Sequence, residues 1–339
     1  MPFLKTRIYR GTPRNLAMLA SALQRGELVA VPTETVYGLA GNAFSTDACA
    51  AIFRAKGRPA NDPLIVHIHD LAQLDQLAHR NPAVEKLARA FWPGPLTLVL
   101  PKKDTVPDLA TSGLPSVAVR MPAHPLFRAL LKKCGLPLVA PSANPFGYIS
   151  PTCAAHVRDG LSGKIRHILN GGDCDIGLES TIVDLRDPRR PKILRPGKIG
   201  AAEITRVLRV PVTAAAKKRP ATTARAELAP GMLSKHYSPK TPVVLHARIT
   251  PALIARIPKN EAVLPLFASK KLRGENIFPL SEKQDLGEAA HNLFAALRAL
   301  DCPEKTWKRI HAELAPASPA SKDRALAAAL NDRLTRAAA

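Results

Sequence analysis

Short apolar runs alternate with amphipathic stretches over the first two thirds of the chain. The apolar runs predict strands, and the amphipathic stretches predict helices. In residues 15–24, for example, Leu16, Leu19, Ala20 and Leu23 share one helical face, and Gly26 follows as a stop signal. The expected strands are 27–33, 62–68, 95–101, 116–122, 136–142, 165–170, 180–185 and 191–197, and the expected helices are 15–24, 46–55, 71–78, 83–90 and 126–133. Interleaved strands and helices predict an α/β sheet flanked by helices, with the strand order left open.

The pattern restarts after Pro239 and predicts a smaller α/β unit. Strands are expected at 241–247 and 261–267, and helices at 251–256, 285–300 and 322–336. Residues 211–240 are rich in Ala, Thr, Pro and basic residues and lack apolar periodicity, which is typical of a linker. We therefore expect a domain over 1–210, a linker over 211–240 and a second domain over 241–339.

Composition is that of an ordinary folded protein. Of 339 residues, 46% are hydrophobic and 22% are charged. No run approaches the roughly 20 apolar residues of a membrane span, and the N-terminus lacks the apolar core of a signal peptide, so we expect a cytoplasmic protein without membrane contact. Five cysteines without CxxC spacing indicate neither a disulfide framework nor a zinc site.

Charge narrows the class of partner. The 49 Lys and Arg against 27 Asp and Glu give a net charge of +22. Such an excess favours anionic partners, namely nucleotides, RNA or an acidic surface, and does not choose among them.

Two segments carry hydroxyl and amide groups at expected strand ends. In 32–44, Thr33, Thr35 and Tyr37 could bind a ligand or cap their own turn. In 138–152, Ser142, Asn144 and Ser150 suit phosphate or ribose recognition, although the segment lacks both the P-loop and the dinucleotide-binding pattern. The chain contains no nucleophile triad motif and no metal-binding HExxH.

Three further segments carry candidate site residues. Lys56 and Arg58 follow a predicted helix and suit polyphosphate, or simply complement the helix dipole. Arg120 ends an apolar strand, which is costly unless a carboxylate substrate or an internal acid pairs with it. His67 stands in an apolar run, where histidines are more often core residues than ligands. His236 and Tyr237 lie in the linker, where an aromatic ring could close a pocket.

Seven segments in order resemble the YrdC-like threonylcarbamoyl-AMP synthases in their long, two-domain form. They are PTETVYGLA, KGRPANDPLIVHI, AVRMP, APSAN, ESTIVD, LRPG and SKHYSP. The resemblance covers nearly the whole chain. It implies a twisted mixed α/β sheet domain of YrdC-like type around a basic cavity, followed by a smaller Rossmann-like α/β domain.

The resemblance implies a nucleotidyltransferase. It would join L-threonine, bicarbonate or CO2, and ATP into threonylcarbamoyl-adenylate and pyrophosphate, with Mg2+ held mainly by the phosphates and no metal held by the protein. A downstream transferase system would then modify tRNA beside the anticodon, and direct contact with tRNA or double-stranded RNA stays open.

The same resemblance assigns roles to particular residues. Lys56 and Arg58 would be catalytic through charge neutralisation. Threonine would be bound by Thr35, His67, Arg120, Ala140 and Ser180. ATP would be contacted by Arg58, Asp62, Ser116, Ser142, Asn144, Ser150, Arg195 and Tyr237, with His236 a weaker candidate.

Two positions depart from the family pattern. Asp62 stands where the family usually has Asn, which places a carboxylate near phosphates, and Phe146 stands where a small residue is common. Two other interpretations remain. One is a non-catalytic RNA-binding or ribosome-assembly protein, suggested by the net charge and by the basic linker residues 217–219. The other keeps the fold but uses carbamoyl phosphate or another amino acid.

Overall fold

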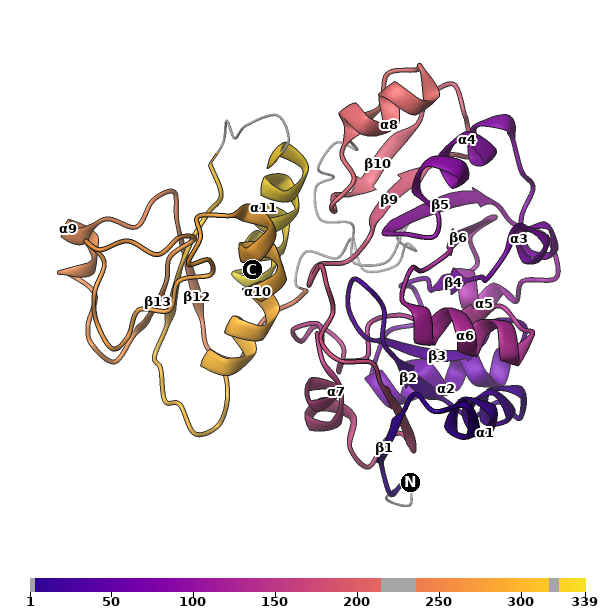
Figure 1. The fold of residues 1–339 in the computed structure, drawn as a ribbon, viewed down its shortest axis with the longest axis horizontal. Coiled ribbons are helices and arrows are strands. Elements are labelled where there is room, and N and C mark those ends of the chain that lie inside the picture. Colours follow the sequence, from indigo (N-terminus) through magenta and orange to yellow (C-terminus); the bar gives the residue numbers. More distant parts are fainter. Residues whose placement is uncertain (1–3, 215–235, 317–322) are drawn as a thin grey trace.

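The computed structural model describes residues 4–214, 236–316 and 323–339. They form two units, which we call the N-terminal unit (4–214) and the C-terminal unit (236–316 and 323–339) (Figure 1). The basic residues 217–219, most of the predicted linker and the first residue of the last predicted helix lie outside the described residues.

A single mixed sheet organises the N-terminal unit. Its strand order is β1-β8-β2-β3-β7-β4-β6-β5-β9-β10-β11, with parallel and antiparallel neighbours. The strands are β1 (Arg7–Arg10), β2 (Val29–Val31), β3 (Gly38–Asn42), β4 (Ile65–His67), β5 (Leu96–Pro101), β6 (Ser116–Arg120), β7 (Leu138–Val139), β8 (His167–Asn170), β9 (Thr181–Asp184), β10 (Lys192–Arg195) and β11 (Thr213–Ala214). The mixed α/β class expected from the sequence is confirmed.

The helices of this unit begin and end at local signals in the sequence. Thr12 accepts a hydrogen bond from the Asn15 amide at the start of the first helix, and Ser45 caps the second in the same way through Ala48. Gly57 ends the second helix with a φ of +63°, a conformation that suits glycine. The helices are α1 (Pro13–Gln24), α2 (Thr46–Lys56), α3 (Leu71–Leu77), α4 (Pro82–Phe91), α5 (Asp108–Thr111), α6 (Pro125–Cys134), α7 (Ala154–Leu161) and α8 (Ala201–Leu208).

Strand alternation decides which face of the sheet each side chain joins. Val29 and Val31 pack with α1 and α6, whereas Ala30 between them packs with α2 on the opposite face. By the same alternation, Ile65 and His67 point away from the core that holds Val66. The functional side chains discussed below lie on this second side of β4 and β6.

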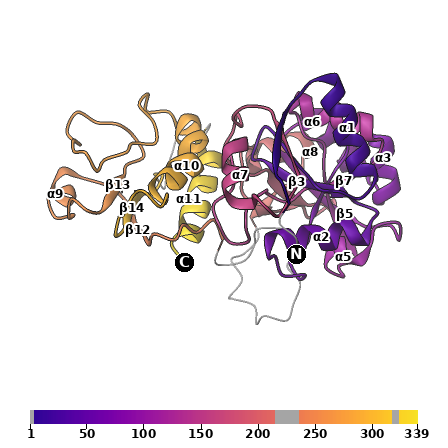
Figure 2. The same cartoon turned by 90° about the horizontal axis from the view of Figure 1, so that it is seen from below.

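The C-terminal unit is a three-stranded parallel sheet with helices. Its strand order is β12-β14-β13, and both pairs are parallel, in keeping with the Rossmann-like expectation. Its elements are β12 (Val243–His246), α9 (Pro251–Ile254), β13 (Ala262–Leu264), α10 (Leu286–Leu300), β14 (Ile310–Glu313) and α11 (Arg324–Ala337). Helices α10 and α11 lie between this sheet and the N-terminal unit in both views (Figures 1 and 2).

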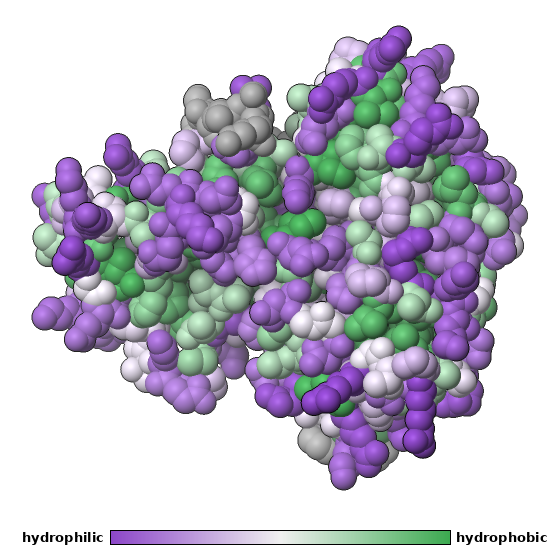
Figure 3. Space-filling model, viewed as in Figure 1, coloured by the Kyte–Doolittle hydropathy of each residue, from purple (hydrophilic) through white to green (hydrophobic). Residues whose placement is uncertain are grey.

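The two units share an apolar core. Ile149, Ile176 and Leu178 of the N-terminal unit belong to one buried cluster with Phe294 and Leu330 of α10 and α11. Hydrophilic side chains cover most of the face shown in Figure 3, and apolar ones are visible where the units meet. The interface therefore resembles an interior more than a loose contact between domains.

The sequence pattern placed most elements correctly. All eight strands predicted before residue 200 are confirmed, as are the helices predicted within the described residues. The pattern missed β1, β3, β11, β14, α5, α7 and α8. Strand β3 contains two glycines, and its pairing with β2 and β7 decides its conformation. Among the described residues no helix has the length and apolar character of a membrane span.

Candidate functional site

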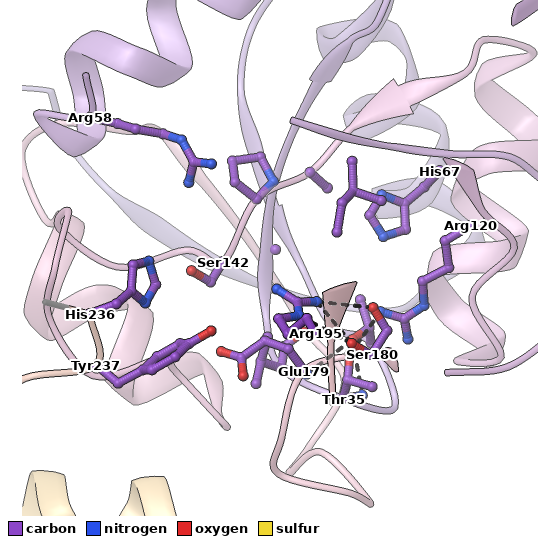
Figure 4. A pocket seen from close by; sticks show the side chains of 16 residues that line it. Thr35, Arg58, His67, Arg120, Ser142, Glu179, Ser180, Arg195, His236 and Tyr237 are labelled. Carbon is purple, nitrogen blue, oxygen red and sulfur yellow. Dashed lines mark hydrogen bonds between the residues drawn. The ribbon is translucent and has the colours of Figure 1, made fainter. Parts of the chain in front are cut away.

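A cavity opens on the side of β4 and β6 that α1 and α6 leave uncovered. About 500 Å³ of space free of atoms, including the part open to solvent, lies between its lining residues. Its two ends are opposite in Figure 4, and we call them the Arg120 end and the Arg58 end. The lining residues are Thr33, Thr35, Val36, Gly38, Arg58, Ile65, His67, Arg120, Ala140, Pro141, Ser142, Glu179, Ser180, Arg195, His236 and Tyr237.

Arg120 is fixed by three neighbours at the Arg120 end. Its Nε donates to the Gly94 carbonyl at 3.2 Å, its Nη1 donates to Thr35 Oγ1 at 2.9 Å, and its Nη2 lies 2.7 Å from Glu34 Oε1. An arginine at the end of an apolar strand is expected to pair with a carboxylate substrate or an internal acid, and here Glu34 is that acid. Burial raises the pKa of Glu34, but the charge of Arg120 outweighs it, so the net pKa lies below its usual value.

His67 lies beside Arg120 because β4 and β6 pair in parallel with these two residues in register. Burial and the charge of Arg120 lower the pKa of His67 to about 3, so the ring is neutral at pH 7. Within the described residues its Nδ1 has no hydrogen-bond partner. The ring lines the cavity and is neutral, which suits it to contact a polar ligand group.

Small polar groups complete this end of the cavity. Ser180 Oγ lies 2.8 Å from Thr97 Oγ1 and accepts from Arg195 Nη2 at 3.1 Å. Ala140 lines the wall and presents no polar side chain. All five residues expected around threonine thus line one cavity, and Thr35, His67, Arg120 and Ser180 lie toward its Arg120 end (Figure 4).

Arg58 points into the opposite end from the loop after α2 (Figure 4). Its Nε donates to the Asp62 carbonyl at 3.0 Å, and its Nη2 donates to the Pro63 carbonyl at 2.7 Å. The same Nη2 lies 2.9 Å from Asp62 Oδ2. Asp62, which stands where the family usually has Asn, therefore forms a buried ion pair with Arg58. Asp62 itself does not line the cavity.

Lys56 lies behind the cavity wall. Its Nζ donates to the carbonyls of Ser142 and Asn144 at 2.5 and 2.6 Å, and it does not line the cavity. Burial and the neighbouring charge of Arg58 hold its pKa well below the usual value. In this structure Lys56 fixes the loop that carries Ser142, which does line the cavity.

Three more residues expected to contact ATP lie outside the lining. Asn144 donates to the carbonyls of Pro145 and Tyr148, which holds its loop. Ser150 donates to Glu179 Oε1 at 2.6 Å, and Ser116 is buried at the start of β6. The structure therefore brings Arg58, Ser142, Arg195 and Tyr237 into the lining and leaves Lys56, Asp62, Ser116, Asn144 and Ser150 just outside it.

Two aromatic side chains after the undescribed stretch form the wall at the Arg58 end. Tyr237 is fully buried, with its ring 5.4 Å from that of Phe294, and its backbone φ is +63°. Its hydroxyl has no hydrogen-bond partner among the described residues and points into the cavity (Figure 4). The His236 ring packs edge-on against Tyr237 at 4.1 Å and against Phe146 at 6.1 Å. Phe146, the second residue that departs from the family pattern, thus contacts His236.

Glu34, Glu179 and Arg333 have structural roles here that were not predicted from the sequence. Glu34 and Glu179 stand inside the segments PTETVYGLA and ESTIVD, but a carboxylate beside a basic cavity is not expected from charge alone. Arg333 lies in an Asn-Asp-Arg run of an Ala-rich helix, which is typical of a solvated face, yet its side chain is completely buried. Only the packing of the two units could reveal it.

The acidic groups of the cavity are already engaged by the protein. Glu179 accepts from Ser150 and Arg333, and Glu34 pairs with Arg120. No group of three or more His, Cys, Asp or Glu within the described ranges has the arrangement of a metal site.

Comparison with known proteins gives consistent matches. Residues 21–197 match the profile of the Sua5–YciO–YrdC family, described as "Telomere recombination", and residues 199–339 match that of "Threonylcarbamoyl-AMP synthase, C-terminal domain". The threonylcarbamoyl-AMP synthase of Pyrococcus abyssi is 42% identical over 84% of this chain and 85% of its own length. That of Bacillus subtilis is 46% identical over 68% of this chain and 66% of its own.

A solved structure extends the similarity to three dimensions. The crystal structure of P. abyssi Sua5 complexed with L-threonine matches with a TM-score of 0.85 at 37% identity, covering 98% of both chains.

Proposed function

This chain belongs to the threonylcarbamoyl-AMP synthase family in its two-domain form, and from that premise we propose that it converts L-threonine, bicarbonate or CO2, and ATP into threonylcarbamoyl-adenylate and pyrophosphate. The observation that carries the proposal is one cavity with the buried Arg120 at one end and Arg58, Ser142 and Tyr237 at the other. We further propose that the product serves tRNA modification through a separate transferase system.

Threonine would bind at the Arg120 end. The Arg120 guanidinium would pair with the threonine carboxylate, in competition with or alongside Glu34. The neutral ring of His67, which lines this end, would contact the substrate amine or hydroxyl. The relative crystallised with L-threonine supports this choice of amino acid.

ATP would bind at the Arg58 end. Arg58 would face the phosphates from that end and Arg195 from its place beside Ser180, the hydroxyl of Ser142 would add a donor, and Tyr237 would cover the nucleotide. Mg2+ would be held mainly by the phosphates, because Glu179, the carboxylate of the cavity lining, is already bound by Ser150 and Arg333; when bound it would neutralise phosphate charge.

The chemistry needs no covalent enzyme intermediate. The deprotonated threonine amine attacks CO2, forming a C–N bond and, after loss of a proton, a carbamate. A carbamate oxygen then attacks the α-phosphorus in line, and the bond from that phosphorus to the bridging oxygen breaks as pyrophosphate leaves. The protein's part is positioning and charge neutralisation, which are the main sources of catalysis in phosphate chemistry.

The test is threonine-dependent pyrophosphate release from ATP with Mg2+ and bicarbonate, with the adenylate detected by mass spectrometry. We expect release only when threonine is present, and little with serine. Threonine-independent release, or a different adenylate, would contradict the proposed reaction. A folded sample with no release and salt-sensitive RNA binding would support the RNA-binding interpretation instead.

A further inference from the structure

One arginine of the C-terminal unit is buried inside the wall of the cavity. Arg333 on α11 has an exposed fraction of 0%. Its Nε donates to Glu179 Oε2 at 2.8 Å, and its Nη1 donates to the Pro196 carbonyl at 2.9 Å. Both acceptors belong to the N-terminal unit, and they flank the cavity residues Ser180 and Arg195 in the sequence.

Glu179, which lines the cavity, binds both Arg333 and Ser150. Its Oε2 accepts from Arg333, and its Oε1 accepts from Ser150 at 2.6 Å. Burial raises the pKa of Glu179, but the charges of Arg333 and Arg195 lower it further, so the carboxylate is ionised. Two partners on its two oxygens fix its position in the cavity wall.

Arg333 also lies beside the aromatic ring at the Arg58 end. Its guanidinium carbon is 5.4 Å from the centroid of Tyr237, a cation–π distance. Phe294 of α10 packs on the same ring. Two helices of the C-terminal unit therefore hold Tyr237, whose hydroxyl points into the cavity (Figure 4).

Interface stability alone is a poor explanation for this arginine. Burying an ion pair removes two charges from water, and well-packed apolar residues of similar volume are often as stabilising. The Nη2 of Arg333, moreover, has no hydrogen-bond partner among the described residues. The same interface already contains an apolar core that includes Leu178, Phe294 and Leu330.

We propose that Arg333 is a positioning residue for ATP, through which the C-terminal unit sets Glu179, Ser150 and Tyr237 at the Arg58 end of the cavity. The inference rests on the proposed function, since it takes ATP as the ligand of that end. Arg333 does not line the cavity, so it acts through these neighbours and is not itself a catalytic residue.

The experiment measures ligand binding by full-length variants, separately from turnover. A non-hydrolysable ATP analogue and L-threonine are each titrated by calorimetry into the wild type, Arg333→Met and Arg333→Lys. We expect Arg333→Met to weaken the ATP analogue at least tenfold while threonine affinity stays within twofold. Arg333→Lys retains the charge and should recover part of the loss.

A double variant guards against simple misfolding. Arg333→Met leaves Glu179 as an unpaired buried carboxylate, which is strongly destabilising. In Glu179→Gln/Arg333→Met that charge is gone. Both residues act through the same contacts. We therefore expect the affinity of the double variant for the ATP analogue to lie within twofold of that of Arg333→Met.

Tyr148→Phe is the matched control. It removes the 2.8 Å hydrogen bond from Tyr148 to Asp301, which also joins the two units, without touching Glu179 or Tyr237. Both ligands should bind this variant as they bind the wild type. Wild-type ATP affinity in the folded Arg333 variants, or equal weakening of both ligands in Arg333→Met and Tyr148→Phe, would overturn the proposal.

The same titrations separate this inference from the proposed reaction. A wild type that binds the ATP analogue but makes no threonylcarbamoyl-adenylate would contradict the reaction alone. Loss of ATP affinity in Arg333→Met would still support the positioning role.

Discussion

Asp62 changes the electrostatics of the Arg58 end at the scale of one residue. Its carboxylate lies 2.9 Å from Arg58 Nη2, and both side chains are buried. A negative charge so close to the guanidinium offsets part of the attraction that Arg58 would exert on a phosphate. The backbone carbonyls of residues 62 and 63 would hold the guanidinium even without the carboxylate.

Asp62→Asn should therefore strengthen ATP binding. We expect affinity for an ATP analogue to rise by about tenfold, the effect of roughly 1.4 kcal/mol of charge interaction, with threonine affinity unchanged. Titration calorimetry measures both. Asp108→Asn, which makes the same charge change at an exposed site, is the control and should have no effect. Weaker ATP binding by Asp62→Asn would mean that the carboxylate is needed to orient Arg58.

His67 links the cavity to the pH dependence of stability. Its pKa falls from 6.5 to about 3 on folding, so between these values the unfolded chain binds a proton that the folded chain does not. The associated stability is fully present above pH 6.5 and is lost as the pH falls toward 3. His156, with a pKa lowered to about 4 by burial and by Arg298, contributes in the same direction.

His67→Gln should flatten this dependence. A difference of one bound proton between the unfolded and the folded chain changes the free energy of unfolding by about 1.4 kcal/mol per pH unit. Near pH 5 the slope of this free energy with pH should therefore be smaller in the variant than in the wild type by about that amount. Urea unfolding at pH 5.0, 5.5 and 6.0 measures the slope. Replacing the exposed His79 with Gln should leave the slope as in the wild type. Equal slopes in His67→Gln and wild type would show that folded His67 accepts a proton.

At the scale of an element, the segment from His236 to Lys240 joins the two units along the cavity. The Ser238 amide donates to the Gly147 carbonyl at 2.8 Å, and its hydroxyl donates to the Arg336 carbonyl at 3.2 Å. The amides of Lys240 and Thr241 donate to Asp301. Anchors on both units place Tyr237 in its left-handed backbone conformation, which is otherwise unfavourable.

Two substitutions at Tyr237 should separate its packing from its polar role. Tyr237→Phe keeps the ring contact with Phe294, so the melting temperature should stay within about 2 °C, while ATP affinity falls several-fold. Tyr237→Ala should lower both the melting temperature and the ATP affinity. Thermal unfolding and ATP-analogue titration test this. Wild-type ATP affinity in Tyr237→Phe would show that the Tyr237 hydroxyl takes no part in ATP binding.

At the scale of the whole molecule, the two units depend on each other. The N-terminal unit contributes Val36, Ile149, Ile176 and Leu178 to the cluster beneath α10 and α11. Gly177, with a φ of +74°, lies so close to His291 on α10 that a Cβ would meet its carbonyl oxygen at 2.4 Å. Arg298 reinforces the contact by donating to the carbonyls of Ile149 and Ser150.

A chain ending at residue 214 should therefore be unstable. It would expose these apolar side chains, worth about 1.5–3 kcal/mol each when buried, and leave Glu179 without Arg333. We expect a melting temperature at least 10 °C lower, with aggregation visible by size-exclusion chromatography. Glu179→Gln in the shortened chain should recover part of the loss. A monomeric shortened chain as stable as the full chain would contradict this account of the interface.

The sequence by itself determined the class of fold, most of the elements and most of the cavity lining. Apolar periodicity is a local signal, so the eight strands and the capped helices could be located without tertiary information. Thr35 and Arg120 could be selected from the pattern as polar residues near strand ends, whereas the site roles of His67 and Arg195 were implied by the family resemblance; all four line one cavity.

Only the tertiary structure decided which charges meet. That Lys56 supports a loop behind the wall, that Asp62 neutralises Arg58, and that Arg333 reaches Glu179 across 154 positions depends on contacts between distant segments. A buried arginine and a solvated one look alike in sequence, because both stand among polar neighbours on a helix. Burial and pairing set the energy of a charge, and both are properties of the packed molecule.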